Sequence, residues 1–160
     1  MAVRMKRKAS TLLSLMCREI MIKFIVDGNP GVKKRPRFAR MGKFVKTYSP
    51  EDNVSYENWV KLCYKNQIKE MAVPYYEPIK VTIVAYFGIP KSWSKKKQKQ
   101  ALLGEILPNN NKDVDNIAKI ILDALNGVAY ADDHFITDLE VSKRYSEIPR
   151  VEIAMERVKP

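Results

Sequence analysis

The spacing of hydrophobic and polar positions predicts both strands and helices along the chain. Strand character, as period-two alternation or as a run of β-branched and aromatic residues, is found in residues 22–26, 79–87, 136–145 and 151–158. In the last of these segments Val151, Ile153 and Met155 fall on one face. We expect the four segments to form one mixed β-sheet.

Three other segments have helical features. Residues 51–71 carry an apolar stripe, and residues 116–126 combine an apolar face with a stop at Asn126-Gly127. Residues 94–104 form a mostly polar segment, expected to be an exposed helix. Its three adjacent lysines are typical of a solubilising surface, although they could also extend a track for DNA.

These elements predict a single α+β domain in which a mixed β-sheet packs against helices. The domain is expected to occupy residues 21–160. Residues 1–20 have a basic start and a short, interrupted apolar stretch without a cleavage site, so we interpret them as a poorly ordered or short-helical extension instead of a secretory signal.

Composition excludes several classes of protein. The chain has 160 residues and is 46% hydrophobic, which excludes wholesale disorder, and no apolar run approaches the about 20 residues of a membrane span. Cys17 and Cys63 are too few for a disulfide framework, which fits a cytoplasmic protein. With a single histidine, a four-ligand zinc site is not expected either.

The net charge of +11 is concentrated in the first part of the chain. Residues 1–46 hold 13 of the 29 Lys and Arg but only 2 of the 18 Asp and Glu, while the remainder is balanced. Seven cations with interleaved aromatics follow a turn cluster and favour contact with a phosphate backbone over a plain solvated surface. The cations are Lys33, Lys34, Arg35, Arg37, Arg40, Lys43 and Lys46.

Aspartates gather in a second region, within residues 113–133. Asp115, Lys119 and Asp123 are spaced to lie along one side of the helix expected over 116–126, with Asp115 as its N-cap. Asp113 precedes them, and Asp132-Asp133 follows after a turn expected to bring this pair near the first. Such carboxylates repel one another unless a cation lies among them, and Mg²⁺ suits oxygen ligands and phosphate chemistry.

A purely structural interpretation of these acids is also open. Asp115 can be only a cap, Lys119 and Asp123 only a surface ion pair, and Asp132-Asp133 only turn residues. Considered together and beside a polycationic segment, the residues favour a Mg²⁺-dependent nuclease of unspecified substrate.

The same residues resemble a known family. Residues 113–127, DVDNIAKIILDALNG, then YADD and then Lys143, are similar to the RusA-type Holliday-junction resolvases, which are small phage- and prophage-associated endodeoxyribonucleases. The family pattern has Asp-x-Asp-Asn-(Leu/Ile)-x-Lys, Asp-Ala-Leu-Asn-Gly, Asp-Asp and Lys in this order. A strand followed by Gly-x-Pro and Arg-Pro-Arg-Phe, here within residues 28–38, also occurs in many members.

The resemblance implies an activity and a set of roles. Asp113, Asp115 and Asp133 would be catalytic carboxylates that bind Mg²⁺ (or Mn²⁺), Asp132 an auxiliary ligand, and Lys119 essential for cleavage. The substrate would be four-way or otherwise branched DNA, cut symmetrically by a homodimer, with no membrane and no organic cofactor involved. Phosphate contacts are expected at Lys33, Lys34, Arg35, Arg37, Arg40 and Lys43, and at Lys143 and Arg144, which could instead orient other groups.

One position departs from the family pattern. Many members carry Gln two residues after the second aspartate of the pair, where this chain has Phe135, and His134 directly follows Asp133. The histidine could shuttle protons beside the metal, but an ordinary turn role is favoured. Two alternatives to junction resolution remain: a general Mg²⁺ nuclease acting on flaps or other branches, and a non-catalytic basic DNA-binding module.

Overall fold

The fold is given by a computed structural model that describes residues 21–158 except 36, 42–43, 49 and 69–75. Side chains are described outside residues 36–49. The predicted extension 1–20, Lys43 and the end of the helix expected over 51–71 lie outside the described residues. No helix in the described parts is long and apolar enough to cross a bilayer.

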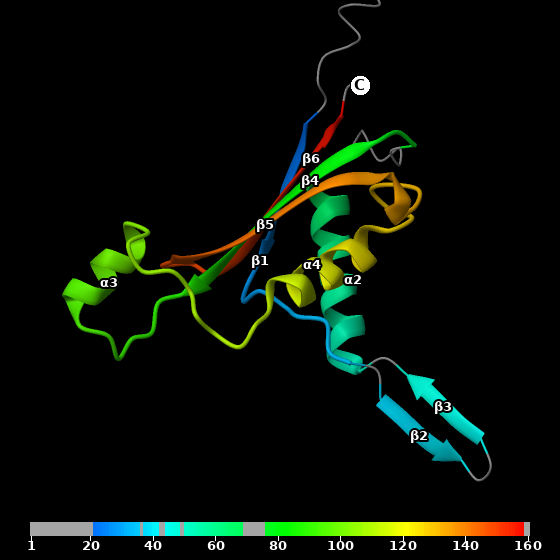
Figure 1. Cartoon of the computed structure of the whole chain (residues 1–160), viewed down its shortest axis with the longest axis horizontal. Helices are drawn as coiled ribbons and strands as arrows, with labels where there is room; N and C mark the ends of the chain where they lie inside the picture. Colours follow the sequence, from blue (N-terminus) through cyan, green and yellow to red (C-terminus); the bar gives the residue numbers. More distant parts are fainter. Residues whose placement is uncertain (1–20, 36, 42–43, 49, 69–75, 159–160) are drawn as a thin grey trace, which may run out of the picture.

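Four strands form the central sheet (Figure 1). Their spatial order is β1 (Ile22–Asp27), β6 (Arg150–Arg157), β4 (Ile79–Gly88) and β5 (Ile136–Ser146). β6 is antiparallel to both of its neighbours, whereas β4 and β5 are parallel. The expected mixed sheet of an α+β protein is therefore confirmed.

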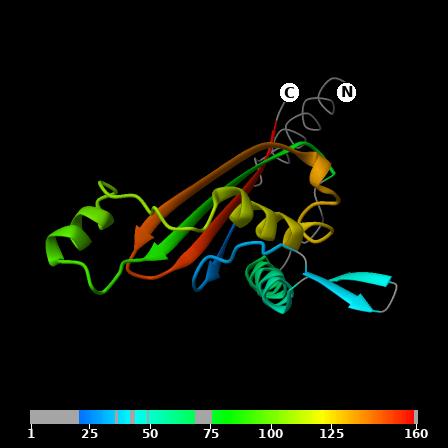
Figure 2. The same ribbon diagram turned by 60° about the horizontal axis from the view of Figure 1, so that its bottom comes forward.

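One face of this sheet is covered by two helices, α2 (Glu51–Gln67) and α4 (Val114–Leu125) (Figure 2). In the two central strands, β4 and β6, every second side chain points into the core. Val151, Ile153 and Met155, which the sequence predicts on one face of β6, are each at most 1% exposed. Burying such aliphatic side chains stabilises the fold by roughly 1.5–3 kcal/mol each relative to exposure. The helices are thereby fixed on the sheet.

The apolar stripe predicted for helix α2, Tyr56, Trp59, Val60, Cys63 and Ile68, is buried at Val60 and Cys63 but differs at Trp59. Trp59 is 42% exposed, and its indole Nε1 donates to the carbonyl oxygen of Asp27 at 3.0 Å. Tyr64 is fully buried instead, edge-on to Phe24. The amphipathic indole satisfies a backbone group at the rim of the core while keeping one side in water.

The connection between β4 and β5 contains α3 (Lys95–Leu102), α4 and the short 3₁₀ helix η1 (Asp133–Phe135). Ser94 caps α3 by accepting from the Lys97 N–H at 3.4 Å. Parallel strands require a long crossover of this kind. The segment that carries the acidic motif is therefore this crossover.

The basic segment contains a hairpin that its sequence pattern did not predict. β2 (Arg37–Met41) pairs antiparallel with β3 (Phe44–Tyr48), and the two strands project away from the sheet in Figures 1 and 2. Frequent cations obscure the apolar alternation by which strands are normally found. The later part of the basic segment therefore forms a two-stranded ribbon, while Lys33, Lys34 and Arg35 precede it.

Candidate active site

Helix α4 begins two residues earlier than predicted and carries the first aspartates at its start. Asp113, not Asp115, occupies the N-cap position: its backbone is extended and its carbonyl oxygen accepts from the Ile117 N–H at 3.1 Å. Neither carboxylate caps the helix, because Asp113 makes no side-chain cap bond and Asp115 lies in the first turn. Both carboxylates remain available for other partners near the positive end of the helix dipole.

Two polar contacts orient this pair. The Asn116 amide Nδ2 lies 3.4 Å from Oδ2 of Asp113, and the Lys119 ammonium lies 3.3 Å from Oδ2 of Asp115, one helical turn away. Both members of the latter pair are exposed, with 62% and 64% of their side-chain area accessible. The N-terminal turn of α4 therefore presents two carboxylates and one ammonium group to solvent.

The loop that leads into this turn is held from the sheet by Lys143. From β5, its ammonium donates to the carbonyl oxygen of Lys112 at 3.0 Å and to the carbonyl and side-chain oxygens of Asn110 at 3.5 and 3.2 Å. The ammonium is thus directed into the loop immediately before Asp113. Of the two roles expected for Lys143, this geometry corresponds to the orienting one.

The other end of α4 carries a differently partnered aspartate. The Lys33 ammonium lies 2.6 Å from Oδ2 of Asp123 and 2.5 Å from Oε1 of Glu57 on α2. Burial alone would lower the pKa of Lys33, but the bonds from Asp123 and Glu57 outweigh it and raise this pKa. Lys33, for which a DNA contact is predicted, pairs in this structure with two carboxylates of its own chain.

The second aspartate pair lies beside this C-terminal end. The hydroxyl of Tyr130 donates to the carbonyl oxygen of Leu122 at 2.6 Å and holds the turn after α4 against the last part of the helix. The pKa of Asp133 is raised mainly by its neighbour Asp132 and to a smaller extent by the charge of Asp123, which places Asp133 near this end of the helix. The pair was expected to approach Asp113 and Asp115; Figures 1 and 2 show η1 beyond the opposite end of α4.

Within this second pair, the two carboxyl groups influence each other. The neighbouring Asp133 carboxyl lowers the pKa of Asp132, and the Asp132 carboxyl raises the pKa of Asp133. Oδ1 of Asp132 also accepts from the Asp133 N–H at 2.7 Å, and Nδ1 of His134 lies 3.3 Å from Oδ2 of Asp132. His134 thus contacts the acidic pair through Asp132.

The donor chemistry of these residues suits a hard divalent cation, because every candidate ligand is a carboxylate oxygen. In the parts of the chain that are described, however, no three His, Cys, Asp or Glu side chains are gathered to hold a metal ion. The expected set of Asp113, Asp115 and Asp133 is accordingly not assembled here. Mg²⁺ commonly takes one or two carboxylates from a protein, with water and phosphate as its other ligands. Asp113 and Asp115 are two exposed carboxylates that lie together at the start of α4.

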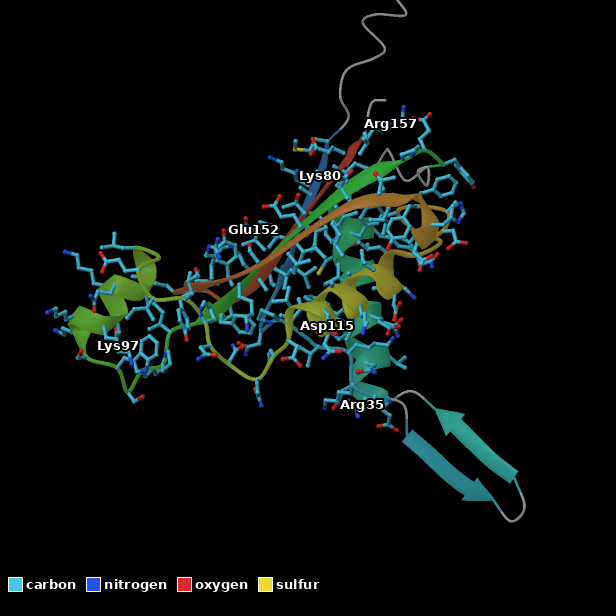
Figure 3. The ribbon with its side chains drawn as sticks, viewed as in Figure 1. Arg35, Lys80, Lys97, Asp115, Glu152 and Arg157 are labelled. Atoms are coloured by element: carbon cyan, nitrogen blue, oxygen red, sulfur yellow. The ribbon has the colours of Figure 1, made fainter. Side chains whose placement is uncertain are left out.

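The remaining predicted DNA contacts fall into three groups. Lys34 is paired with Asp52 across to α2, while Arg35 is exposed (labelled in Figure 3) and has no ion pair with a described residue. Arg144 is exposed on β5 and donates to the Lys143 carbonyl at 2.7 Å. The side chains of Arg37, Arg40 and Lys43 lie outside the described ones.

Asn53 was missed by sequence reasoning. It is 1% exposed, and its amide accepts from the Lys34 N–H at 3.0 Å and donates to the Lys34 carbonyl at 2.9 Å. Nearby, a Cβ on Gly31 would lie 2.6 Å from the Tyr56 ring, so only glycine fits. These contacts fix the path of the chain from β1 to the hairpin; no local pattern marks an asparagine in the first turn of a helix for such a role.

Comparison with known families bears directly on this arrangement. Residues 27–156 match the family model described as endodeoxyribonuclease RusA, and this span includes every aspartate discussed above. The chain belongs to the RusA family. Membership confirms the resemblance drawn from the acidic motif and identifies the chain as a nuclease-type hydrolase of DNA.

A relative of this RusA-family chain is known from Bacillus subtilis (strain 168). It is the uncharacterized protein YqaN, which is 37% identical over 139 residues, corresponding to 86% of this chain and 96% of YqaN. The similarity thus extends over nearly the whole relative, although its name states no activity.

Proposed function

We propose that this RusA-family protein is a Mg²⁺-dependent endonuclease that resolves four-way DNA junctions by symmetric phosphodiester hydrolysis. The observation that supports this most is the exposed N-terminal turn of α4, where Asp113, Asp115 and Lys119 lie together in the segment that matches the family. Four-way junctions are favoured over other DNA because of the family to which the chain belongs.

In this proposal each residue of the turn has a defined task. Asp113 and Asp115 hold the cation. Asp132 and Asp133, beyond the other end of α4, belong to the same family motif but have no task at this turn in the proposal. When bound, Mg²⁺ supplies a Lewis acid that activates water and offsets charge developing on the phosphodiester. Mn²⁺ would fit the same oxygen donors. Lys119 contacts a phosphate oxygen at the cleaved position and stabilises its added negative charge.

The proposed assembly is a homodimer. A four-way junction has strands to be cut at symmetric positions, and a two-fold dimer presents one active site to each. Phosphates would be held by Arg35 and the β2–β3 hairpin, so that DNA shape more than base sequence determines the substrate. A reducing, cytoplasmic location fits the buried free thiol of Cys63.

The test is cleavage of three synthetic substrates of equal strand length: a four-way junction, a flap and a linear duplex. Wild-type protein with Mg²⁺ should cut the junction at paired, symmetric positions and the other two at least about tenfold more slowly. Without a divalent ion the junction should be bound and left uncut. Lys119→Ala should retain binding and lose about 10²–10³-fold in cleavage rate, the size expected for one electrostatic stabiliser.

Asp138→Asn is a matched control, because Asp138 is an exposed aspartate near the motif but outside it. It should cut like wild type. Preferential cleavage of the flap would identify a general branch nuclease, and junction binding without any cleavage in Mg²⁺ or Mn²⁺ would identify a non-catalytic DNA-binding module. Either result would contradict the proposal.

A further inference from the structure

Helix α3 carries a lysine face that no step of the proposed reaction uses. Lys95, Lys96 and Lys99 are exposed, and their spacing of three and four residues places Lys99 beside both of the others. We call these three residues the α3 lysine face. Like charges at this spacing destabilise a helix, and cations in its first turn also oppose the helix dipole. These three lysines therefore destabilise the helix that carries them.

The α3 lysine face is also unneutralised. None of its three ammonium groups forms an ion pair within the described part of the chain, and the first turn of α3 contains no acid. By contrast, Lys33 is paired with Asp123 and Lys80 with Glu140. The positive charge on α3 is thus left for a partner outside the chain.

The helix is nevertheless fixed to the body of the protein. Ala101 is 1% exposed, and Trp93, just before the helix, packs edge-on against Tyr145 of β5 with ring centroids 5.3 Å apart. Lys97 lies 4.0 Å over the Trp93 ring, and the Gln98 amide donates to the Trp93 carbonyl at 2.7 Å. These contacts use the opposite side of α3 and hold the lysine face at a set position relative to β5.

The α3 helix and the basic segment lie on opposite sides of the candidate active site. In Figures 1 and 2, α3 lies at one end of the molecule and the β2–β3 hairpin at the other, with α4 between them. Figure 3 shows Asp115 between Lys97 of α3 and Arg35 at the start of the hairpin. A nucleic acid bound over the N-terminal turn of α4 would therefore have cationic surfaces on both sides of the cleaved phosphate.

We propose that the α3 lysine face binds the phosphates of a second duplex arm of branched DNA, on the far side of the cleavage position from the arm held by Arg35 and the hairpin. The proposal rests on the proposed function and extends it by assigning two arms to two surfaces. A linear duplex lies along one surface at a time, so the α3 lysine face contributes to junction binding more than to duplex binding.

The test is a titration of a four-way junction and a linear duplex with the full chain, in EDTA, over a series of salt concentrations. The variant is Lys95→Gln, Lys96→Gln and Lys99→Gln combined. The matched control removes three exposed or half-exposed lysines from other elements, as Lys23→Gln, Lys61→Gln and Lys65→Gln combined. Both triple variants change net charge equally, and thermal unfolding checks that both are folded.

The α3 variant should bind the junction about tenfold or more weakly at low salt. The slope of log affinity against log salt concentration should become less negative by about 2–3. This corresponds to nearly one unit for each phosphate that the variant no longer neutralises. Duplex affinity and the control variant should change by less than about threefold. Hydroxyl-radical footprints should show weaker protection on one side of the cleavage position only.

Equal losses on junction and duplex, or a footprint that does not change, would overturn the assignment of a second arm. Behaviour like the control triple would show that the lysines serve only solubility and would also overturn it. Because these measurements need no metal and no cleavage, failure of the proposed catalytic function is detected separately, by the cleavage assay with wild-type protein.

Discussion

The two ends of α4 carry similar residues in very different settings. At the N-terminal end, Asp113 and Asp115 are exposed, and among the described side chains their partners are Asn116 and Lys119, at 3.4 and 3.3 Å. At the C-terminal end, Asp123 is held at 2.6 Å by a half-buried lysine. The two ends are about 18 Å apart along a 12-residue helix.

The difference shows which carboxylates are already satisfied by the protein. Asp123 has a cation of its own, and Asp132 accepts from the Asp133 N–H and lies 3.3 Å from Nδ1 of His134. Asp113 and Asp115 have no comparable compensation, apart from one exposed ion pair of the kind that contributes little in water. The N-terminal end is therefore the end that an external cation would stabilise most.

The largest expected effect separates two aspartates on the same face of α4. Asp115→Asn should reduce junction cleavage by about 10³-fold or more while leaving junction binding intact, because a carboxylate ligand is removed. Asp123→Asn should reduce cleavage less than about tenfold and instead lower thermal stability, because its partner is Lys33. Single-turnover cleavage rates and melting curves of both variants measure these two effects. If both variants lost the same factor in cleavage rate, the assignment of the metal site to the N-terminal end would be wrong.

A smaller effect is expected from the loop that precedes the N-terminal turn. Lys143→Met keeps the length of the side chain but removes its bonds to the oxygens of Asn110 and Lys112. The loop before Asp113 should loosen, weakening the apparent Mg²⁺ affinity by about 10–100-fold, as for residues that orient metal ligands. Cleavage measured against Mg²⁺ concentration should therefore recover at high Mg²⁺.

Arg144→Met is the control for this loop, since Arg144 is exposed and donates to its neighbour's carbonyl oxygen. It should leave the Mg²⁺ dependence unchanged and lower DNA affinity slightly. If Lys143→Met instead weakened DNA binding with an unaltered Mg²⁺ dependence, Lys143 would be a phosphate contact and not a positioning residue.

The sequence predicted the sheet and the helices well because their signals are local. The alternation at Val151, Ile153 and Met155 is carried by neighbouring residues, and the acidic motif is continuous enough for its family to be identified. The partners of the charged residues could not be predicted in this way. Lys33 meets Asp123 and Glu57 only because α2, α4 and the segment after β1 pack together.

The same reason explains the changed interpretation of Asp115 and Asp133. The N-cap position depends on where the backbone leaves its extended path, which here is at Asp113, two residues before the predicted cap. The position of Asp133 depends on how Tyr130 holds the turn against Leu122. Neither feature has a periodic signal, so the spacing of the aspartates could not show that the two pairs lie at opposite ends of α4.

The smallest expected effect concerns the ion pair that neutralises the C-terminal end. A double-mutant cycle with Lys33→Met and Asp123→Asn, measured by urea unfolding at neutral pH, should give a coupling of about 0.5–1 kcal/mol, modest because the Asp123 side chain is 52% exposed. Lys33→Met alone should lower the free energy of unfolding more than Asp123→Asn does, because it leaves Glu57 without this lysine as well.

This coupling should also depend on pH. Since folding raises the pKa of Lys33, the coupling is fully present at neutral pH and is lost only as pH rises through that pKa. If the losses in unfolding free energy of the two single variants simply add up in the double variant, Lys33 does not stabilise Asp123. The two ends of α4 would then not differ in this respect.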